Sequence, residues 1–130
     1  MSEIPEIVRA EMHAHAKACL PNEACGYLVG DSPAGRIQRF VPITNAARSP
    51  TRFVFEPHAQ LAAEQAIDAA GEQVIGIAHS HPNGEPTPSA VDIGDAGRFD
   101  PFGMLLHVVI APMTGEIRSH RIIGGEAVSV

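Results

Sequence analysis

The chain shows two spacings of hydrophobic residues, one typical of helices and one typical of strands. Apolar residues recur every three or four positions over residues 4–20, which predicts an amphipathic helix. Residues 57–71 are expected to form a second helix, because Pro57 stands at an early position and Gly71 at the end, where helices favour these residues. A third helix is expected to begin in the segment 89–99.

Short runs rich in apolar and β-branched residues predict the strands of a sheet. They lie at residues 23–31, 36–43, 51–56, 73–81, 104–112, 116–123 and 126–130. The first two would pair as a hairpin across SPAG (32–35), and the glycines at 124–125 would turn the chain into the last strand. Strands interleaved with helices and joined by tight turns predict an α/β (α+β) fold, with a mixed sheet flanked by helices and residues 1–130 forming one domain.

The charge of the chain narrows the classes of partner. Nine Lys and Arg stand against fifteen Asp and Glu, and the net charge of −6 comes with no basic cluster. We therefore expect neither nucleic acid nor an anionic membrane as a partner. No apolar run approaches the roughly 18 residues of a membrane span, and the acidic start is unlike a signal peptide. A cytoplasmic protein with Cys19 and Cys25 as reduced thiols is expected.

Two copies of the pattern His-x-His differ in the structure predicted around them. His13 and His15 fall in the first helix, where residues two apart point about 200° away from each other, so they cannot bind one ion together. His15 lies on the apolar stripe and is expected to pack, whereas His13 is expected to be solvated. His79 and His81 end a predicted strand and project from the same face, where they could bind Zn²⁺ together. The simpler interpretation is two polar residues at the end of a strand.

A carboxylate could complete the second pair of histidines. The turn-rich segment 82–88 leads to Ser89 at the start of the predicted third helix, with Asp92 three residues further on. A rigid loop could return Asp92 over the histidines as a third ligand. Ser89 and Asp92 also fit a capping box, in which the acid binds a backbone N–H at the helix start. Since Asp92 could hardly do both with the same oxygens, its role separates a metal site from a helix cap.

Three protein ligands would leave a fourth tetrahedral position for water, which is typical of catalytic rather than structural zinc. Zinc lowers the pKa of bound water to about 7, and a carboxylate is then needed to manage the proton. Glu23 stands just ahead of a hydrophobic strand, an unusual place for a charge unless it caps the preceding loop or faces a cleft. Glu85 and Asp95 are the alternative bases.

Other polar residues have simpler interpretations. Cys25 could face the site but is expected to be a buried structural thiol. Asn45 and Arg48 could hold a substrate backbone or tail, or belong to an ordinary turn. His107, inside a hydrophobic strand, is expected to lie in the core. No role is predicted for His58 and His120.

The chemistry-bearing residues together resemble the signature of the JAMM (MPN+) zinc metalloprotease family. The matching residues are Glu23, then His79, Ser80, His81 and Pro82, then Ser89 and Asp92, with the family's spacing and no gap. The resemblance covers nearly the whole chain. The segments PNEACGYLVG and PITNAARSPTRFVFEP look most like the short bacterial Mec-type peptidases, which act on ubiquitin-like sulfur-carrier proteins.

This resemblance implies a zinc ion held by His79, His81 and Asp92, with Glu23 as general acid/base and Ser89 steadying the oxyanion. It also implies a curved mixed sheet with helices packed against it. The implied reaction is hydrolysis of the amide bond after the C-terminal glycine of a ThiS- or MoaD-type carrier protein. The leaving amine, whether cysteine, lysine or a peptide, is left open, and a homo-oligomer is possible.

Other functions remain as alternatives. The sequence HPNGEPTPSAVDI also resembles the RadC branch of the superfamily, although the helix-hairpin-helix region of that branch is absent. A non-catalytic scaffold of the same fold would be expected to lack part of the ligand set, which is complete here. A nucleobase deaminase would need H-x-E and P-C-x-x-C, and neither occurs. Ubiquitin itself is not expected as the natural substrate, because the insertions of eukaryotic deubiquitinases have no evident room.

Overall fold

The computed structural model describes residues 4–32 and 35–130, which form three helices and six strands. The helices are α1 (Glu6–Cys19), α2 (Pro57–Ala69) and α3 (Ala90–Phe99). The strands are β1 (Cys25–Gly30), β2 (Ile37–Ile43), β3 (Gln73–Ser80), β4 (Leu106–Ala111), β5 (Glu116–Ile123) and β6 (Glu126–Ser129). The predicted α+β class, the three helices and six of the seven strands are confirmed. Part of the predicted turn 32–35, residues 33–34, lies outside the described residues.

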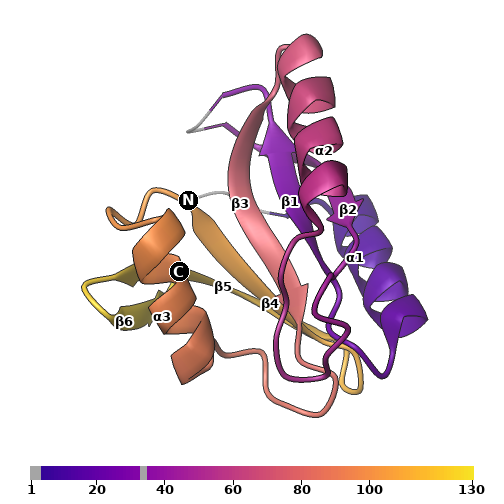
Figure 1. The fold of residues 1–130 in the computed structure, drawn as a ribbon, viewed down its shortest axis with the longest axis vertical. Helices are drawn as coiled ribbons and strands as arrows, with labels where there is room; N and C mark the ends of the chain where they lie inside the picture. Colours follow the sequence, from indigo (N-terminus) through magenta and orange to yellow (C-terminus); the bar gives the residue numbers. More distant parts are fainter. Residues whose placement is uncertain (1–3, 33–34) are drawn as a thin grey trace.

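The six strands form one mixed sheet in the order β2-β1-β3-β4-β5-β6 (Figure 1). Neighbouring strands are antiparallel except β3 and β4, which run parallel. A parallel pair needs a crossover connection, and here that connection contains α3. The chain therefore leaves the end of β3, passes through a loop and α3, and returns to the sheet beside the same strand.

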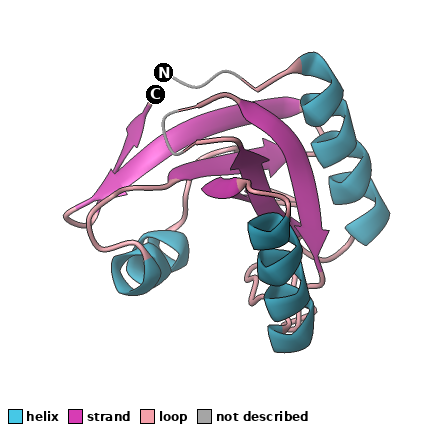
Figure 2. Ribbon diagram, turned by 90° about the horizontal axis from the view of Figure 1, so that it is seen from above, coloured by secondary structure: helices cyan, strands magenta, loops and turns pink. Residues whose placement is uncertain are grey.

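Helices cover both faces of this sheet (Figure 2). On one face, Val8 and Met12 of α1 are fully buried against Leu28 of β1. On the other face, Ile67 of α2 packs with residues that alternate with Leu28, such as Tyr27. Side chains alternate along a strand, so each residue of β1 and β3 has a predictable face. No helix among the described residues is long and apolar enough to cross a bilayer.

The predicted strand at 51–56 is wrong. Only an isolated bridge between Asn45 and Phe55 forms there. The Asn45 side chain accepts the N–H groups of Ala47 and Val54 and donates to the carbonyl of Arg52, so it takes up backbone groups that a neighbouring strand would otherwise bind. The segment is therefore an extended edge held to its own loop rather than a member of the sheet.

The two histidines of α1 partly follow the prediction. His15 is half-buried beside Phe40, with ring centroids 5.6 Å apart, which agrees with its place on the apolar stripe. The prediction of a solvated His13 is wrong, since this residue is also half-buried and its Nδ1 atom is buried without a hydrogen-bond partner among the described residues. A Cβ atom on Gly115 would lie 4.0 Å from the His13 ring, so the turn between β4 and β5 covers this histidine.

Candidate metal centre

The end of β3 carries the two histidines onto the face of the sheet that α2 and α3 cover. His79 lies two residues after Ile77, which packs in the core cluster of that face, so alternation places both side chains on the same side. His81 follows with the same parity, and the two Nε2 atoms lie 3.2 Å apart. The His79 ring is 3% exposed and stacks on Phe53 at a centroid distance of 4.7 Å.

The orientation of His81 is fixed by the loop that follows it. Its Nδ1 atom lies 2.9 Å from the carbonyl oxygen of Glu85. A carbonyl can only accept a hydrogen bond, so Nδ1 carries the proton and Nε2 is the atom available to a metal. Metal-binding histidines usually have such a hydrogen bond on the opposite nitrogen. Burial lowers the pKa of His79, which favours the neutral ring that metals bind.

The same loop is held from a distant strand. His120 of β5 is 4% exposed, and its Nε2–H donates to the carbonyl of Pro86 at 3.0 Å. This bond fixes the middle of the segment that leads to Ser89 and Asp92. No role was predicted for His120. His120 lies two residues before the buried Ile122 on a half-buried strand, so alternation would have placed its side chain on the inner face. Nothing in the sequence indicates that its partner is the Pro86 carbonyl, 34 residues away.

Asp92 is a helix cap and a neighbour of the histidines at once. Its Oδ2 atom accepts the Ser89 N–H at 2.8 Å, and Ser89 Oγ accepts the Asp92 N–H at 3.1 Å, which completes the capping box. The same Oδ2 lies 3.0 Å from Nε2 of His79 and 3.0 Å from Nε2 of His81. The expected conflict between the two roles does not arise in the geometry, since one carboxylate oxygen, with two lone pairs, accepts the cap bond and still faces both histidines.

These three atoms fit the donor set of a tetrahedral zinc ion. Zinc–nitrogen and zinc–oxygen bonds of about 2.0–2.1 Å imply ligand atoms about 3.3 Å apart, and the observed separations are 3.0–3.2 Å. Three acceptor atoms this close repel one another unless a proton or a cation lies between them. Burial alone would raise the pKa of Asp92, but the proximity of His79 and His81 outweighs it and holds this pKa well below its usual range.

The pairing of β1 with β3 brings Glu23 close to the two histidines. Cys25 of β1 lies opposite His79 of β3 in an antiparallel pair, and two further residues place Glu23 opposite His81. The pairing continues past the strand ends, because Ser80 N–H donates to the Ala24 carbonyl and Ala24 N–H to Ser80 Oγ. A carboxylate oxygen of Glu23 and ring nitrogens of both histidines all lie within 4.8 Å of one another.

One oxygen of the Glu23 carboxylate is buried without a hydrogen-bond partner among the described residues. This oxygen is Oε1, and the residue as a whole is 2% exposed. Burial raises the pKa of Glu23 from 4.5 to about 8. Such a perturbed acid beside potential metal ligands is typical of a proton-transfer group rather than of a structural residue.

The two alternative bases lie elsewhere. Glu85 is exposed and contributes its backbone carbonyl, not its side chain, to the site. Asp95 pairs with Arg98 on α3 and with Arg52 across the mouth of a neighbouring groove. Of the three candidate bases, Glu23 is therefore the one that the structure brings together with His79 and His81.

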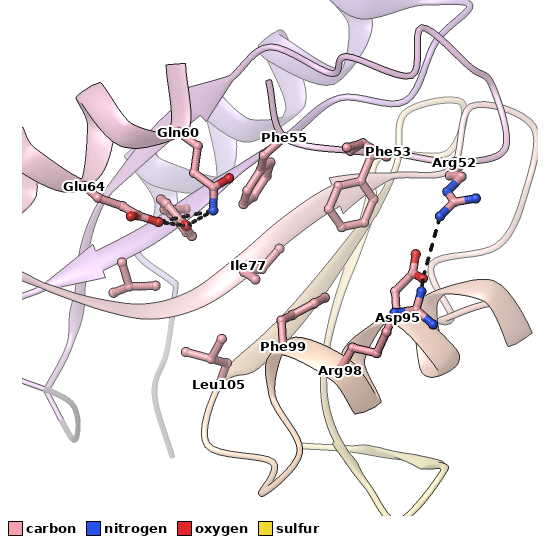
Figure 3. Close-up of a pocket in the computed structure, with 13 residues that line it drawn as sticks. Arg52, Phe53, Phe55, Gln60, Glu64, Ile77, Asp95, Arg98, Phe99 and Leu105 are labelled. Atoms are coloured by element: carbon pink, nitrogen blue, oxygen red, sulfur yellow. Dashed lines mark hydrogen bonds and ion pairs between the residues drawn. The ribbon is translucent and has the colours of Figure 1, made fainter. Parts of the chain in front are cut away.

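A small cleft of about 280 Å³ opens at these residues, with Glu23, His81 and Ser89 in its wall. Beside it, a larger groove of about 700 Å³ runs between α2 and α3 (Figure 3). The rings of Phe53 and Phe55 line this groove with Ile77 below them. Since Phe53 also stacks on His79, the groove leads to the candidate metal ligands.

Phe53 and Phe55 line this groove, and among the described residues their backbone N–H and C=O groups have no hydrogen-bond partner. Val54 donates its N–H to the Asn45 side chain and accepts from Ala46 N–H, while Glu56 N–H donates to Thr44. Backbone groups alternate in direction along an extended chain. The N–H and C=O groups of Phe53 and Phe55 therefore point away from the loop, where an added strand could bind them.

The remaining candidates have structural roles. Cys25 is buried and its thiol donates to the carbonyl of Ile43, and burial raises its pKa to about 12. His107 is buried with Nε2 at 2.9 Å from Asp100 Oδ2, as expected of a core histidine. Asn45 uses both side-chain atoms to organise its own loop, which favours the turn interpretation for this residue.

Comparison with known proteins identifies the family to which the sequence of this chain is similar. Residues 5–123 match the family model described as prokaryotic homologs of the JAB domain. The CysO-cysteine peptidase of Mycobacterium tuberculosis is 37% identical over 123 residues, which cover 92% of this chain and 84% of that protein. A desampylase of Haloferax volcanii is 38% identical over 73 residues, covering 55% of this chain and 52% of that one. The solution structure of DSY2949 from Desulfitobacterium hafniense superposes with a TM-score of 0.86 at 32% identity, over 100% of this chain and 90% of the other.

Proposed function

The chain belongs to the family of prokaryotic homologs of the JAB domain, the JAMM (MPN+) family, and on that premise we propose that it is a zinc-dependent peptidase. Its substrate is the amide bond after the C-terminal glycine of a ubiquitin-like sulfur-carrier protein of the ThiS or MoaD type. The observation that carries the proposal is the buried carboxylate of Glu23, one oxygen of which has no hydrogen-bond partner among the described residues, beside three converging potential ligand atoms. Residues 1–130 act as one catalytic domain in this proposal, in the cytoplasm.

His79, His81 and Asp92 would hold the metal through the three atoms that already converge. A bound zinc ion supplies an acidified water nucleophile and polarises the substrate carbonyl. The protein orients these residues in advance, because the Glu85 carbonyl accepts the N–H of His81 Nδ1 and the Ser89 N–H donates to Asp92 Oδ2.

Glu23 moves the proton. Its carboxylate accepts a proton from water as the water oxygen bonds to the substrate carbonyl carbon, and delivers it to the leaving nitrogen as the carbon–nitrogen bond breaks. The products are a carrier with a free C-terminal carboxylate and a free amine. Burial raises the pKa of Glu23 to about 8 in the metal-free site, so this carboxyl group holds a proton firmly enough to deliver it to the leaving nitrogen near neutral pH.

Ser89 would stabilise the oxyanion. Its Oγ atom accepts the Asp92 N–H, which leaves the hydroxyl proton available to donate into the cleft that Ser89 lines. A donor fixed in this way is already oriented when negative charge develops on the substrate oxygen.

The groove between α2 and α3 would receive the flexible tail of the carrier. An extended tail lying beside Phe53 and Phe55 could bind their outward backbone groups and add a strand to this edge. The end of the tail would then reach His79. The terminal glycine has no side chain, and a larger residue would clash at this position. This support favours a peptidase over a non-catalytic scaffold, which has no need of the buried acid.

Metal content tests the site. The purified protein should hold about one zinc ion per chain, and Asp92→Ala should weaken binding, as measured by elemental analysis and competition with a chelator. The exposed Asp31 provides a matched control, because Asp31→Ala changes a carboxylate far from the histidines. Full zinc occupancy in a variant lacking His79 and His81 would contradict the proposed ligand set.

Substrate preference tests the reaction. The zinc-loaded protein should release a ThiS-type carrier from a carrier–cysteine adduct, and should cleave ubiquitin chains slowly or not at all. Replacing the terminal glycine of the carrier with a bulky residue should stop cleavage while the folded carrier still binds. Efficient cleavage of ubiquitin chains with the carrier adduct untouched would show that the substrate is wrong.

A further inference from the structure

The groove between α2 and α3 and the small cleft at Glu23 follow the same two walls, one after the other. The groove is lined by residues 52–55 of the extended edge and by Asp95 on α3. The small cleft is lined by residues 50–51, which precede that edge, and by Ser89, which precedes α3. His81 lies in the wall of the small cleft, next to the groove's end at the candidate metal ligands. A chain lying in the groove would therefore pass these ligands and continue into the small cleft.

The small cleft is the space beyond the scissile nitrogen. It contains Glu23, which would protonate that nitrogen, and Ser89, which would stabilise the oxyanion, whereas the groove contains neither. If the carrier tail fills the groove as far as His79, the leaving group lies on the side of Glu23. The volume of about 280 Å³ is just below the roughly 300–1,000 Å³ of typical small-molecule sites. The cleft therefore has room for about one residue of the leaving group.

The wall of the small cleft offers one neutral hydrogen-bonding side chain that is not already engaged. None of the described residues that line it is Lys or Arg. The Oγ1 atom of Thr51 lies 3.2 Å from Oγ of Ser49, and Oγ of Ser89 is bound in the helix cap. The side chain of Asn83 is exposed and has no hydrogen-bond partner among the described residues. Its amide can both donate and accept hydrogen bonds without carrying charge.

The turn after His81 fixes the position of Asn83. The Gly84 N–H donates to the His81 carbonyl at 3.3 Å, and the His81 ring donates through Nδ1 to the carbonyl of Glu85. Asn83 is thus held in a short loop that is bound twice to a candidate metal ligand. Its φ is negative, since Arg48 is the one non-glycine residue with a positive φ in the described part of the chain. Alanine can therefore replace Asn83 without backbone strain.

We propose that the small cleft binds the leaving group, and that the Asn83 amide donates a hydrogen bond to the main-chain carboxyl or carbonyl oxygen of the residue released. This inference rests on the proposed function and concerns the amine that it leaves open. In a residue linked through its α-amine, such as cysteine, this oxygen is one carbon away from the reacting nitrogen and falls within the cleft. In a lysine linked through its side chain, the main-chain carbonyl stands at the far end of a four-carbon stem, beyond a cleft of this size. Asn83 therefore favours an α-linked residue over an isopeptide-linked lysine.

Three adducts test this hydrogen bond. A ThiS-type carrier is joined through its terminal glycine to the α-amine of cysteine, to that of cysteine amide, or to cysteamine, which has the same thiol but no carboxyl group. The zinc-loaded parent should cleave the first two with a kcat/KM about tenfold higher than the third, the value of about one good hydrogen bond. Asn83→Ala should bring the three values within about twofold of one another. Asn83→Asp keeps the size of the side chain but removes its donor, and should lose the preference in the same way.

A matched variant and two structural readouts separate this role from a loss of structure. Asn22→Ala changes an asparagine in a cleft of about 510 Å³ beside α1, which also contains Arg48 but none of the three candidate metal ligands. This variant should keep the parent preference. Asn83→Ala should keep the zinc content and the unfolding midpoint of the parent.

Equal cleavage of the three adducts by the parent, or an unchanged preference in Asn83→Ala and Asn83→Asp, would overturn the inference. Fast cleavage of the cysteine adduct alone would also overturn it, because a neutral amide binds a carboxylate and an amide carbonyl alike. Cleavage of no adduct by the zinc-loaded parent would instead contradict the proposed function, and the inference with it.

Discussion

Replacing Glu23 with glutamine should stabilise the metal-free protein at neutral pH, even though it should remove activity. Glu23 is 2% exposed and one of its oxygens has no partner. Burial raises its pKa from 4.5 to about 8. Between these two values the folded state keeps the proton and the unfolded state loses it, so the free energy of unfolding falls as the pH rises.

The stability gain of Glu23→Gln depends on the difference between the two pKa values of Glu23, in the folded and the unfolded state. One pKa unit corresponds to about 1.36 kcal/mol, so the raised pKa of Glu23 lowers the free energy of unfolding by about 3 kcal/mol at pH 7 and by about 5 kcal/mol well above pH 8. Glutamine has a similar shape and no charge. Glu23→Gln should therefore match the parent near pH 4.5 and exceed it increasingly up to pH 8.

Urea unfolding of chelator-treated protein at pH 5, 7 and 8.5 measures the difference. Glu85→Gln is the matched control, since it neutralises an exposed carboxylate in the neighbouring loop and should change the free energy of unfolding by no more than about 0.5 kcal/mol. A Glu23→Gln protein that is less stable than the parent throughout this range would refute the reasoning, because the carboxylate would then have partners that stabilise it.

Three further changes test separate parts of the site. Asp92→Asn should keep the helix cap and the unfolding midpoint but lose zinc affinity in a chelator titration, and equal affinity would make this residue a cap only. His120→Ala should weaken zinc binding about tenfold, because the loop at Pro86 loses its hydrogen bond. His58→Ala changes an exposed histidine and should leave zinc affinity unchanged. Equal zinc affinity of His120→Ala and the parent would show that His120 does not position the loop. Phe53→Ala should raise the KM for the carrier adduct, because the groove loses a wall beside the reaction site, and steady-state kinetics showing an unchanged KM would place the tail elsewhere.

The sequence was sufficient where chemistry follows a local spacing. Alternation along one strand placed His79 and His81 on one face, and the three-residue spacing from Ser89 to Asp92 predicted the capping box. The JAMM signature identified the family on the same residues. These features depend on neighbours in the chain, which a sequence displays directly.

Features that depend on pairing between distant segments could not be predicted in this way. The approach of Glu23 to His81 follows from the register of β1 against β3, which no local pattern specifies. The bond from His120 to Pro86 joins residues 34 positions apart. The segment 51–56 has the composition of a strand, but the Asn45 side chain takes its backbone hydrogen bonds. In each case a tertiary contact decided the outcome.

We propose above that this chain hydrolyses a carrier adduct by proton transfer through Glu23 at a zinc site. The most direct measurement is mass spectrometry of a ThiS-type carrier–cysteine adduct incubated with the zinc-loaded protein and with zinc-loaded Glu23→Gln. The account predicts free carrier and cysteine from the parent, and product formation slower by about 10²–10⁴-fold from the variant, with zinc content unchanged. Equal rates from the two proteins, or an adduct left intact by the zinc-loaded parent, would contradict it.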